Sequence, residues 1–241
     1  MLTTTELNQF ARNYYLATDI ADHRLENQIQ IDSIPRILSH VHPDARVLEL
    51  GYGDGLLTAA LQQHCRRAEL LEGSDLLCER ARAKHEGLVM HQALFETFTP
   101  EQPYDTVLAL HVLEHLDDPA LILRRIGGWL APGGTVVIVV PNRDSLHRRL
   151  ALKMGMIAHL DELSARDHLV GHQRVYDFAD LERDVVAAGM RVRGRFGSFL
   201  KTLPNSMMLG FSEELVTALD SISDELPPQL LANIGLVAER V

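Results

Sequence analysis

The sequence has few cysteines, no long apolar run and no excess of positive charge. Its two cysteines, Cys65 and Cys78, form neither a disulfide framework nor a metal-binding spacing, so a reducing compartment is expected. No apolar stretch approaches the roughly 20 residues that cross a bilayer, and the N-terminal residues lack the basic and apolar regions of a signal peptide. These absences predict a cytoplasmic protein without a transmembrane segment.

The charge balance argues against one class of partner. The formal net charge is −10, whereas nucleic-acid-binding domains favour a basic face. We therefore expect no nucleic-acid partner, although a local basic patch is compatible with an acidic total. Hydrophobic residues make up 46% of the 241 residues, which suffices for one domain with a sizeable core, or one domain plus a cap. The composition implies no particular oligomeric state.

A strand, a glycine-rich turn and a helix are predicted between residues 46 and 64. The apolar run 46–50 is typical of a buried parallel strand, and the apolar spacing of 56–64 favours a helix. Glycine adopts positive φ and lets a ligand lie against bare backbone. Three glycines stand at alternate positions between the two elements, namely Gly51, Gly53 and Gly55. This arrangement is typical of a nucleotide-type cofactor site, although a purely structural turn is the alternative.

The glycine spacing restricts which classes of cofactor the turn could bind. A dinucleotide fingerprint requires Gly-x-Gly-x-x-Gly, but Leu56 occupies the third glycine position. A phosphate-binding loop would need Gly-Lys-Ser/Thr, which is also absent. The string Glu-x-Gly-x-Gly-x-Gly resembles the first motif of the class I S-adenosylmethionine-dependent methyltransferases. That cofactor carries an ammonium and a sulfonium, which suit an acidic strand end. The resemblance implies cofactor-binding roles for Glu49, Gly51, Tyr52, Gly53 and Gly55, with the acid and the glycines around the methionine part.

Later segments extend the resemblance to about residue 142. The run 72–82 is similar to the second motif, and Glu72 would accept hydrogen bonds from both ribose hydroxyls. Phe95 would stack on adenine or belong to the core, and Glu96 is the nearest acid for the adenine amino group. Leu110, at the end of the predicted strand 103–110, would pack beside the cofactor. Leu-Glu-His-Leu at 113–116, Pro-Gly-Gly at 132–134 and the apolar strand 135–140 follow in the family's order.

The resemblance implies a fold and a domain organisation. We expect an α/β, Rossmann-like fold with a seven-stranded, mostly parallel sheet, helices on both faces and an antiparallel last strand. Residues 1–42 would form a helical N-terminal cap on a methyltransferase domain, 43–241, with cap insertions at about 143–172 and 200–228. Within the rest of the chain we expect helices at 146–156, 160–165, 178–188 and 212–222, and strands at 190–196 and 234–240.

Candidate acceptor-binding and catalytic residues are less constrained. A histidine suits the base that deprotonates the acceptor, because its ordinary pKa lies near neutral pH, and His111 and His172 are the candidates. Tyr14, Tyr15 and Arg24 would line the pocket if the leading helices cover it, or else pack and face solvent. Arg174 and Lys201 would hold an anionic substrate group, or serve as surface charges.

A metal site is the alternative use of one histidine cluster. His111, Glu114 and His115 are spaced i, i+3 and i+4, which places them on one face if the segment is helical. The string looks like the Glu-x-x-Glu-His of ubiquinone-pathway O-methyltransferases, some of which are described as metal-dependent. Here His111 replaces the first Glu, which disfavours a hard magnesium site, so we expect no metal.

The expected activity is S-adenosylmethionine-dependent methyl transfer to an oxygen or nitrogen of a small-molecule acceptor by in-line displacement. The pattern is nearest to small-molecule, ubiquinone-pathway-like O-methyltransferases. One alternative is a non-catalytic relative that binds the cofactor and acts as a partner subunit. Another is an aminopropyl transferase on the same fold, which the Pro-Gly-Gly and Leu-Glu-His-Leu segments disfavour.

Overall fold

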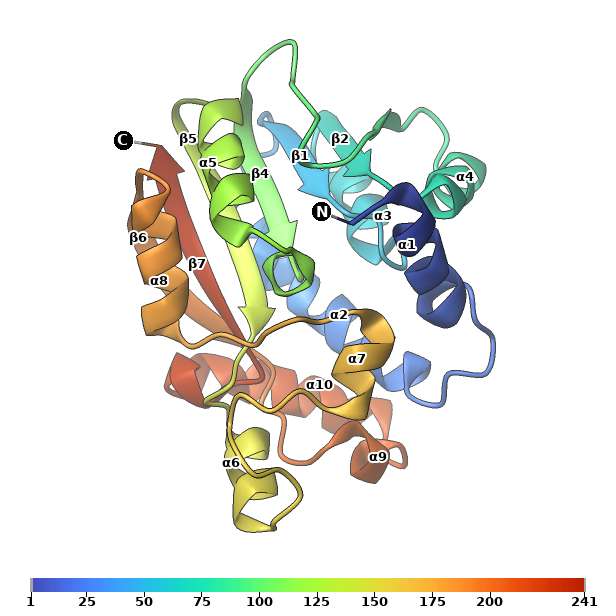
Figure 1. Ribbon diagram of the computed structural model, residues 1–241, viewed down its shortest axis with the longest axis vertical. Helices are drawn as coiled ribbons and strands as arrows, with labels where there is room; N and C mark the ends of the chain where they lie inside the picture. The colour runs from blue at the N-terminus through green and yellow to red at the C-terminus, as the bar shows by residue number, and fades with distance from the viewer. Residues whose placement is uncertain (1, 241) are drawn as a thin grey trace.

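A seven-stranded sheet forms the centre of the molecule, with helices on both faces (Figure 1). The computed structural model describes residues 2–240, so Met1 and Val241, the outer ends of the expected ranges 1–42 and 43–241, lie outside the described residues. The spatial order of the strands is β3-β2-β1-β4-β5-β7-β6. The strands are β1 (Arg46–Leu50), β2 (Arg67–Glu72), β3 (Val89–Gln92), β4 (Tyr104–Leu110), β5 (Leu130–Pro141), β6 (Met190–Ser198) and β7 (Asn233–Arg240).

The direction of the strands confirms the expected sheet. β1 pairs in parallel with β2 and β4, and β3 and β5 extend the parallel part on either side. β7 runs antiparallel to both β5 and β6. The chain leaves β1 towards β2 and later returns to the other side of β1 with β4, so the order reverses between β1 and β4. In open α/β sheets ligands bind beside the carboxyl ends of the strands at such a reversal.

The two faces of the sheet bury different residues of the same strands. Along β4, Val107 and Ala109 belong to one core cluster and Leu108 to another, as expected because successive strand side chains point to opposite faces. The first cluster includes Ile126 of α5 (Pro119–Trp129) and Leu181 of α8 (Phe178–Ala187). The second includes residues of α2 (His23–Leu38) and α3 (Leu56–His64). A strand buried on both faces explains the near-continuous apolar runs of the sequence.

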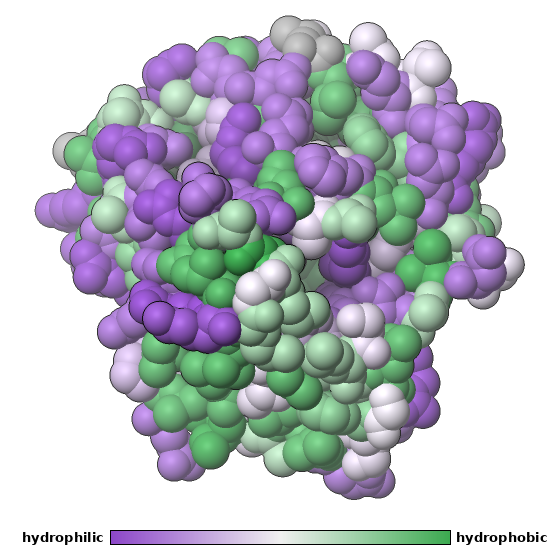
Figure 2. All heavy atoms as spheres, turned by 60° about the horizontal axis from the view of Figure 1, so that its bottom comes forward, coloured by the Kyte–Doolittle hydropathy of each residue, from purple (hydrophilic) through white to green (hydrophobic). Residues whose placement is uncertain are grey.

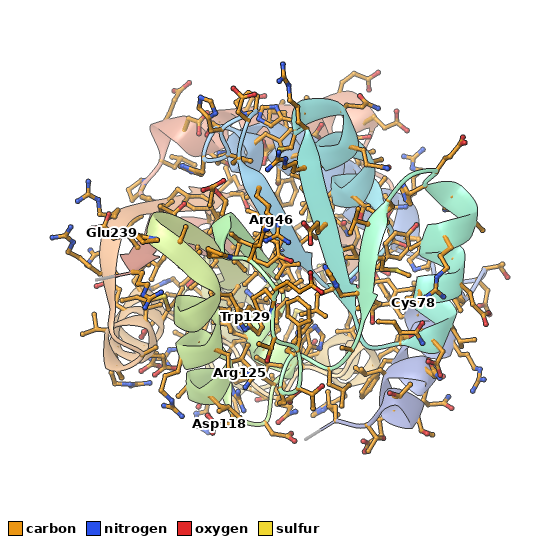
Figure 3. All side chains as sticks on the ribbon, turned by 90° about the horizontal axis from the view of Figure 1, so that it is seen from above. Arg46, Cys78, Asp118, Arg125, Trp129 and Glu239 are labelled. Atoms are coloured by element: carbon orange, nitrogen blue, oxygen red, sulfur yellow. The ribbon has the colours of Figure 1, made fainter. Side chains whose placement is uncertain are left out.

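The end of the sheet at which the parallel strands begin is held by charged side chains (Figure 3). Arg46 Nε lies 2.7 Å from Glu69 Oε1, and the Arg46 guanidinium also covers the ring of Tyr104. Arg125 donates to the carbonyl of Phe95 and stands over Trp129. The Arg46 contacts hold the amino ends of β1, β2 and β4 together, away from the carboxyl ends where a ligand is expected.

The remaining helices gather mainly at that opposite edge, where α2, α6, α7 and α10 lie beyond the carboxyl ends of β4 and β5 (Figure 1). Arg36 of α2 pairs with the buried Asp220 of α10 at 3.3 Å. No helix within residues 2–240 is long and apolar enough to cross a membrane. The elements are α1 (Thr4–Phe10), a π-helical segment (Ala11–Tyr15), α4 (Asp75–Lys84), α6 (Leu146–Lys153), α7 (Ala165–Val170), α9 (Asn205–Met208) and α10 (Glu213–Ser221).

The structure corrects one expected helix and confirms two others. The helix expected at 160–165 is wrong, because α7 begins only at Ala165, where the Ser164 side chain accepts from the Asp167 N–H in a capping box. Ser74 caps α4, since its side chain accepts from the Leu77 N–H. The Pro-Gly-Gly segment at 132–134 lies within β5, which continues through it with a register shift against β4. The helices expected at 178–188 and 212–222 are confirmed within one residue at each end.

Candidate active site

The glycine turn after β1 has the left-handed backbone that its sequence predicts. Gly51, Gly53 and Gly55 have φ of 80°, 53° and 79°. A Cβ placed on Gly51 would meet no atom within 4 Å, so open space lies directly above its backbone. A Cβ on Gly55 would lie 2.4 Å from the Tyr52 hydroxyl. The first glycine therefore leaves room for a ligand, and the third leaves room for a side chain of the protein.

Glu72 and Tyr52 connect this turn to the end of β2. The Glu72 carboxylate accepts from the backbone N–H groups of Tyr52 and Ser74 at 2.8 and 2.7 Å. Burial raises the pKa of Glu72, against the opposing effect of these hydrogen bonds. The Tyr52 ring packs in a cluster with Leu70 and Leu77, and its hydroxyl lies 3.0 Å from His85 Nε2. Tyr52 thus meets the turn through its backbone, while its ring belongs to the core.

Glu49 is a carboxyl group held inside the sheet. Its side chain is buried, and the Thr58 hydroxyl donates to its Oε2 at 2.7 Å. Burial raises the pKa of Glu49 to about 8, the Thr58 hydrogen bond opposes this rise, and nearby Glu72 adds to it. At neutral pH the carboxyl is therefore largely protonated in the free protein.

A first cavity of about 130 Å³ opens between Glu72, the turn and the N-terminal helix. Phe95 and Glu96 line it, as does Phe10 of α1. Gly73 lies against the Leu7 side chain, since a Cβ there would come within 2.6 Å of Leu7 Cδ1. Asn8 also accepts from the Ser74 hydroxyl at 2.8 Å, which ties α1 to the β2–α4 turn. A mostly apolar slot with carboxylates at its margin suits a nucleoside.

A second, larger cavity of about 300 Å³ continues from the same turn towards α2, α6 and α7. The two cavities share the wall residues Tyr15, Gly51, Gly53, His111, Val112, His115 and Val170. Glu49 and Leu110 line the second cavity only, together with His172, Tyr14 and Lys201. A group bound across the shared wall would reach into both spaces.

His111 stands at this shared wall. It is one of two non-glycine residues of the described chain with positive φ, at 54°, a conformation that costs about 1–3 kcal/mol and often marks functional sites. Its side chain is 43% exposed, and its Nδ1 lies 3.2 Å from Glu114 Oε1. Its backbone N–H donates to Val139 of β5. The hydrogen bond to Glu114 leaves the other ring nitrogen free for a ligand.

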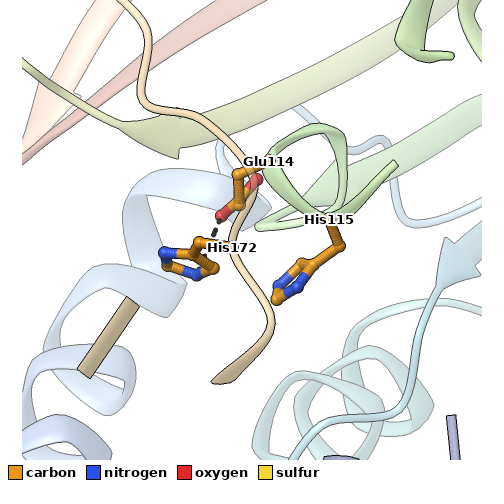
Figure 4. A group of neighbouring side chains, drawn as sticks. All are labelled: Glu114, His115 and His172. Carbon is orange, nitrogen blue, oxygen red and sulfur yellow. Dashed lines mark ion pairs between the residues drawn. The ribbon is translucent and has the colours of Figure 1, made fainter. Parts of the chain in front are cut away.

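Glu114, His115 and His172 form a compact group beside His111. Figure 4 shows both imidazoles near the Glu114 carboxylate, with His115 on the same turn and His172 on the segment after α7. One ligand atom from each lies within 4.8 Å of the others, so among residues 2–240 this group could hold a divalent metal. Burial lowers the pKa of His115 to about 4, and His172 Nδ1 lies 2.8 Å from Asp167 Oδ1.

The Glu114 carboxylate is the charge at the centre of this group. Its side chain has no exposed surface, and its Oε2 has no hydrogen-bond partner among the described residues. Burial opposes its ionisation, but the hydrogen bond from His111 and the neighbouring imidazoles outweigh burial and lower the pKa of Glu114. The negative charge of this buried carboxylate would stabilise a cation that forms beside it.

A network of charges that the sequence analysis did not identify closes the second cavity. Arg166 of α7 donates to Asp22 at 2.6 Å and to the Tyr14 hydroxyl at 2.5 Å, and pairs with Glu26 at 3.5 Å. Asn205 of α9 donates to Asp22 at 2.6 Å. The network joins four elements that are distant in the sequence. The sequence shows the capping and amphipathic patterns of each element, but these patterns do not specify which residues will be partners. Figure 2 shows this end of the molecule, where polar and apolar side chains lie side by side.

Two of the predicted pocket residues lie elsewhere. Arg174 does not line either cavity, and its guanidinium donates to the backbone carbonyls of Leu113 and Leu116, which supports the turn that carries Glu114. Arg24 lies on the surface with 68% of its side chain exposed and pairs with Glu213 at 3.8 Å. Both arginines satisfy local partners, so the expectation that they line the pocket is corrected.

Comparison with known proteins identifies the family. Residues 21–193 match the methyltransferase domain family. The ubiquinone biosynthesis O-methyltransferase of Aeromonas salmonicida is 31% identical over 175 residues, 68% of this chain and 71% of that protein. A trans-aconitate 2-methyltransferase of Methylobacterium radiotolerans is 37% identical over 105 residues, 42% of this chain and 40% of that protein.

The solved structures agree on the fold. The N-methyltransferase NodS from Bradyrhizobium japonicum, in complex with S-adenosyl-L-homocysteine, has a TM-score of 0.57 at 16% identity and covers 97% of this chain and 98% of its own. The open space above Gly51 and the carboxylate of Glu72 fit a cofactor without phosphates. The chain belongs to the class I S-adenosylmethionine-dependent methyltransferases, and S-adenosylmethionine is its cofactor.

Proposed function

We propose that the protein methylates an oxygen or nitrogen of a small-molecule acceptor held in the second cavity. The observation that supports this proposal is the wall shared by the two cavities, which includes Gly51, Gly53 and His111. S-adenosylmethionine, when bound, supplies a methyl group on a sulfonium whose leaving group is a neutral thioether. Residues around the junction then need only align the acceptor, exclude water and accept a proton.

In this proposal the first cavity holds the nucleoside. Glu72 accepts from the ribose hydroxyls, Phe95 stacks on the adenine, and Glu96 lies near its amino group. Each Glu72 oxygen already accepts one backbone N–H, and each retains a second lone pair for a hydroxyl. The methionine part lies over the turn, beside Leu110 and Glu49. A protonated Glu49 near an incoming ammonium is expected to lose its proton on binding.

His111 is the base that we favour, because it lines both cavities and its Nδ1 is committed to Glu114. His172 is the second candidate. Its Nδ1 contact with Asp167 holds the ring so that Nε2 faces the cavity side of Glu114, 3.9 Å away. Either imidazole would accept the acceptor's proton and become a cation stabilised by the buried carboxylate.

We also propose that the segments 1–42, 143–172 and 200–228 form the cap over the acceptor. Arg166 of α7 joins the second segment to the first, since it donates to Asp22 and to the Tyr14 hydroxyl. Lys201 and Asn205 bring the third segment to Glu26, which Lys201 approaches to 3.8 Å. These contacts would keep water from the junction during transfer.

The test combines calorimetry with product detection. We expect micromolar binding of S-adenosylmethionine and S-adenosylhomocysteine to the purified protein. Incubation with phenolic and carboxylate metabolites should then release S-adenosylhomocysteine only when an acceptor is present. His111→Ala should lower kcat for the acceptor found by at least tenfold, with cofactor binding intact, while the exposed His159→Ala leaves kcat unchanged. Tight cofactor binding without turnover on any fraction of small cellular metabolites would refute the proposal and leave a non-catalytic binding protein.

A further inference from the structure

The second cavity contains a lysine whose hydrogen-bonding capacity is unused. The sequence has only three lysines, Lys84, Lys153 and Lys201. Lys84 and Lys153 are exposed, whereas only 16% of the Lys201 side chain is accessible and it lines the cavity. The nearest carboxylate oxygen, Glu26 Oε1, lies 3.8 Å from Nζ, beyond hydrogen-bond distance. Within residues 2–240 its ammonium donates no hydrogen bond, although it carries three donors.

The other cations of the cavity have partners already. Arg166 donates to Asp22 and to the Tyr14 hydroxyl. Arg148 donates to the carbonyl of Leu160 at 2.9 Å and to that of Glu162. Among the three cationic side chains that line the cavity, Lys201 is therefore the one with donors to spare. Buried polar groups without partners are costly, so their presence beside a cavity indicates a ligand.

His147 of α6 is a second unpaired donor in the same cavity. Its Nδ1 is buried and has no hydrogen-bond partner in the described chain. Burial lowers the pKa of His147 to about 3, and the charge of Lys201 adds to this effect. The imidazole is therefore neutral, and it lines the same cavity as Lys201. A neutral imidazole can donate one hydrogen bond to an anion.

The backbone before Lys201 is held in an uncommon conformation. Phe199 has φ of 61° and is the only non-glycine residue besides His111 with positive φ in residues 2–240. Its carbonyl accepts from the N–H groups of Lys201 and Ala232 at 3.0 and 2.8 Å. Both strained residues line the second cavity. Strain of this kind persists only where the surrounding structure imposes it, and it clusters at ligand sites.

Glu26 does not account for Lys201. Its Oε1 already accepts from Asn205 and pairs with Arg166 at 3.5 Å. Burial raises the pKa of Glu26, but the charge of Lys201, the charge of Arg166 and the Asn205 hydrogen bond outweigh burial and lower the pKa to about 2. Glu26 keeps the hydrogen bond from Asn205 and the ion pair with Arg166 when the Lys201 ammonium turns to a ligand, while an amine ligand placed there would face Arg166 and Lys201.

We propose that Lys201 and His147 bind a carboxylate group of the acceptor, so that the protein methylates carboxylate-bearing small molecules. The proposal rests on the methyl transfer proposed above. One ammonium with unused hydrogen-bond donors and one neutral imidazole donor match a carboxylate, which carries a single negative charge and two acceptor oxygens. A phosphate monoester carries about −1.5 to −2 at neutral pH and three strong acceptor oxygens, more than these two side chains would satisfy.

The three lysines make a direct test practicable. Protein labelled with ¹⁵N at the lysine side chains and saturated with S-adenosylhomocysteine would be titrated with acetate, then benzoate, and with neutral acetamide as control. Lys201→Met assigns the Lys201 signal, and Lys153→Met is the matched control. We expect acetate or benzoate to shift the Lys201 signal saturably while the Lys84 and Lys153 signals and the acetamide titration stay flat. His147→Phe should weaken the carboxylate response at least fivefold.

Two results would overturn the carboxylate site. One is a Lys201 signal that responds to neither carboxylate, or that shifts no more than the exposed lysines. The other is a larger response to methylammonium than to acetate, which would assign the cavity to an amine through Glu26. Calorimetry separates these outcomes from a failure of the proposed function. Lys201→Met should bind S-adenosylhomocysteine within twofold of wild type, whereas absence of cofactor binding by the wild type would refute the methyl transfer itself.

Discussion

Replacement of Glu72 by glutamine tests the proposed cofactor site most directly. The wild-type carboxylate accepts one backbone N–H on each oxygen, from Tyr52 and Ser74. The amide of Glu72→Gln keeps one acceptor and turns an NH₂ group towards the other backbone donor. The amide is close to the carboxylate in shape, so the substitution leaves the shape of the cavity unchanged and its effect is mainly electrostatic.

The magnitude follows from the two ribose hydrogen bonds. A hydrogen bond to a charged group contributes about 1.5–3 kcal/mol and one to a neutral group about 0.5–1.5 kcal/mol. The loss of charge should therefore cost about 1–1.5 kcal/mol per hydroxyl, or about 2–3 kcal/mol in all. Since 1.4 kcal/mol is tenfold in Kd, affinity for S-adenosylmethionine should fall about 30- to 140-fold. The backbone donor left facing the NH₂ group should also lower the free energy of unfolding by about 1–3 kcal/mol.

Calorimetric titration with S-adenosylmethionine and S-adenosylhomocysteine measures the effect, and urea denaturation measures stability. Glu69→Gln is the matched control, because Glu69 lies on the same strand but pairs with Arg46 at the far end of the sheet. The Kd of this variant for S-adenosylmethionine should stay within twofold of the wild-type value. Burial raises the pKa of Glu72, so wild-type affinity should weaken as the pH falls and approach that of the variant. A Kd of Glu72→Gln within twofold of wild type, in folded protein, would refute the assignment.

Three further predictions address other parts of the site. Gly51→Ala should weaken cofactor binding at least tenfold, because the methyl group enters the open space above the turn and because left-handed φ costs alanine about 1–2 kcal/mol. Gly87→Ala is the control for strain alone, since Gly87 also has positive φ and open space around it. Equal cofactor affinities of the two variants would contradict the argument. Burial raises the pKa of Glu49 from 4.5 to about 8, so the folded state binds more protons between these values and stability from this group falls as the pH rises through that window. Glu49→Gln should therefore gain stability relative to wild type between pH 5 and pH 8 in urea denaturation, and a pH-independent difference would speak against a buried, titrating Glu49. Dialysis against a chelator should leave activity and melting temperature unchanged, and activity lost on chelation but restored by zinc or magnesium would instead assign Glu114, His115 and His172 to a metal.

The parts of the fold that follow from local sequence were predicted well. Apolar runs ending in glycine turns identified the parallel strands, because a strand buried on both faces has no polar side. The alternating glycines predicted positive φ after β1, and all three have it. The family resemblance then implied an antiparallel last strand, and the pairing of β7 with β5 and β6 confirms it.

The errors arose where local patterns had more than one solution. The segment 160–165 is apolar enough for a helix, but the capping box at Ser164 and Asp167 starts α7 later. Arg174 was predicted to meet an anion because its charge suits one, yet backbone carbonyls of Leu113 and Leu116 satisfy the same guanidinium. A residue type states what a side chain is able to bind, and only its neighbours decide what it does bind.

The sequence by itself determined the fold class, the cofactor turn and the identity of the cofactor, because each follows from short motifs and from their order along the chain. The tertiary structure alone decided the second cavity. It brought Tyr14, His147, Arg166 and Lys201 together from the N-terminal helices, α6, α7 and the end of β6. The periodicity of a sequence does not specify such tertiary contacts, since they depend on how whole helices and strands pack. The physical reason is that packing decides which donors find acceptors. It gave Arg166 hydrogen-bond acceptors and left Lys201 and His147 with unused donors.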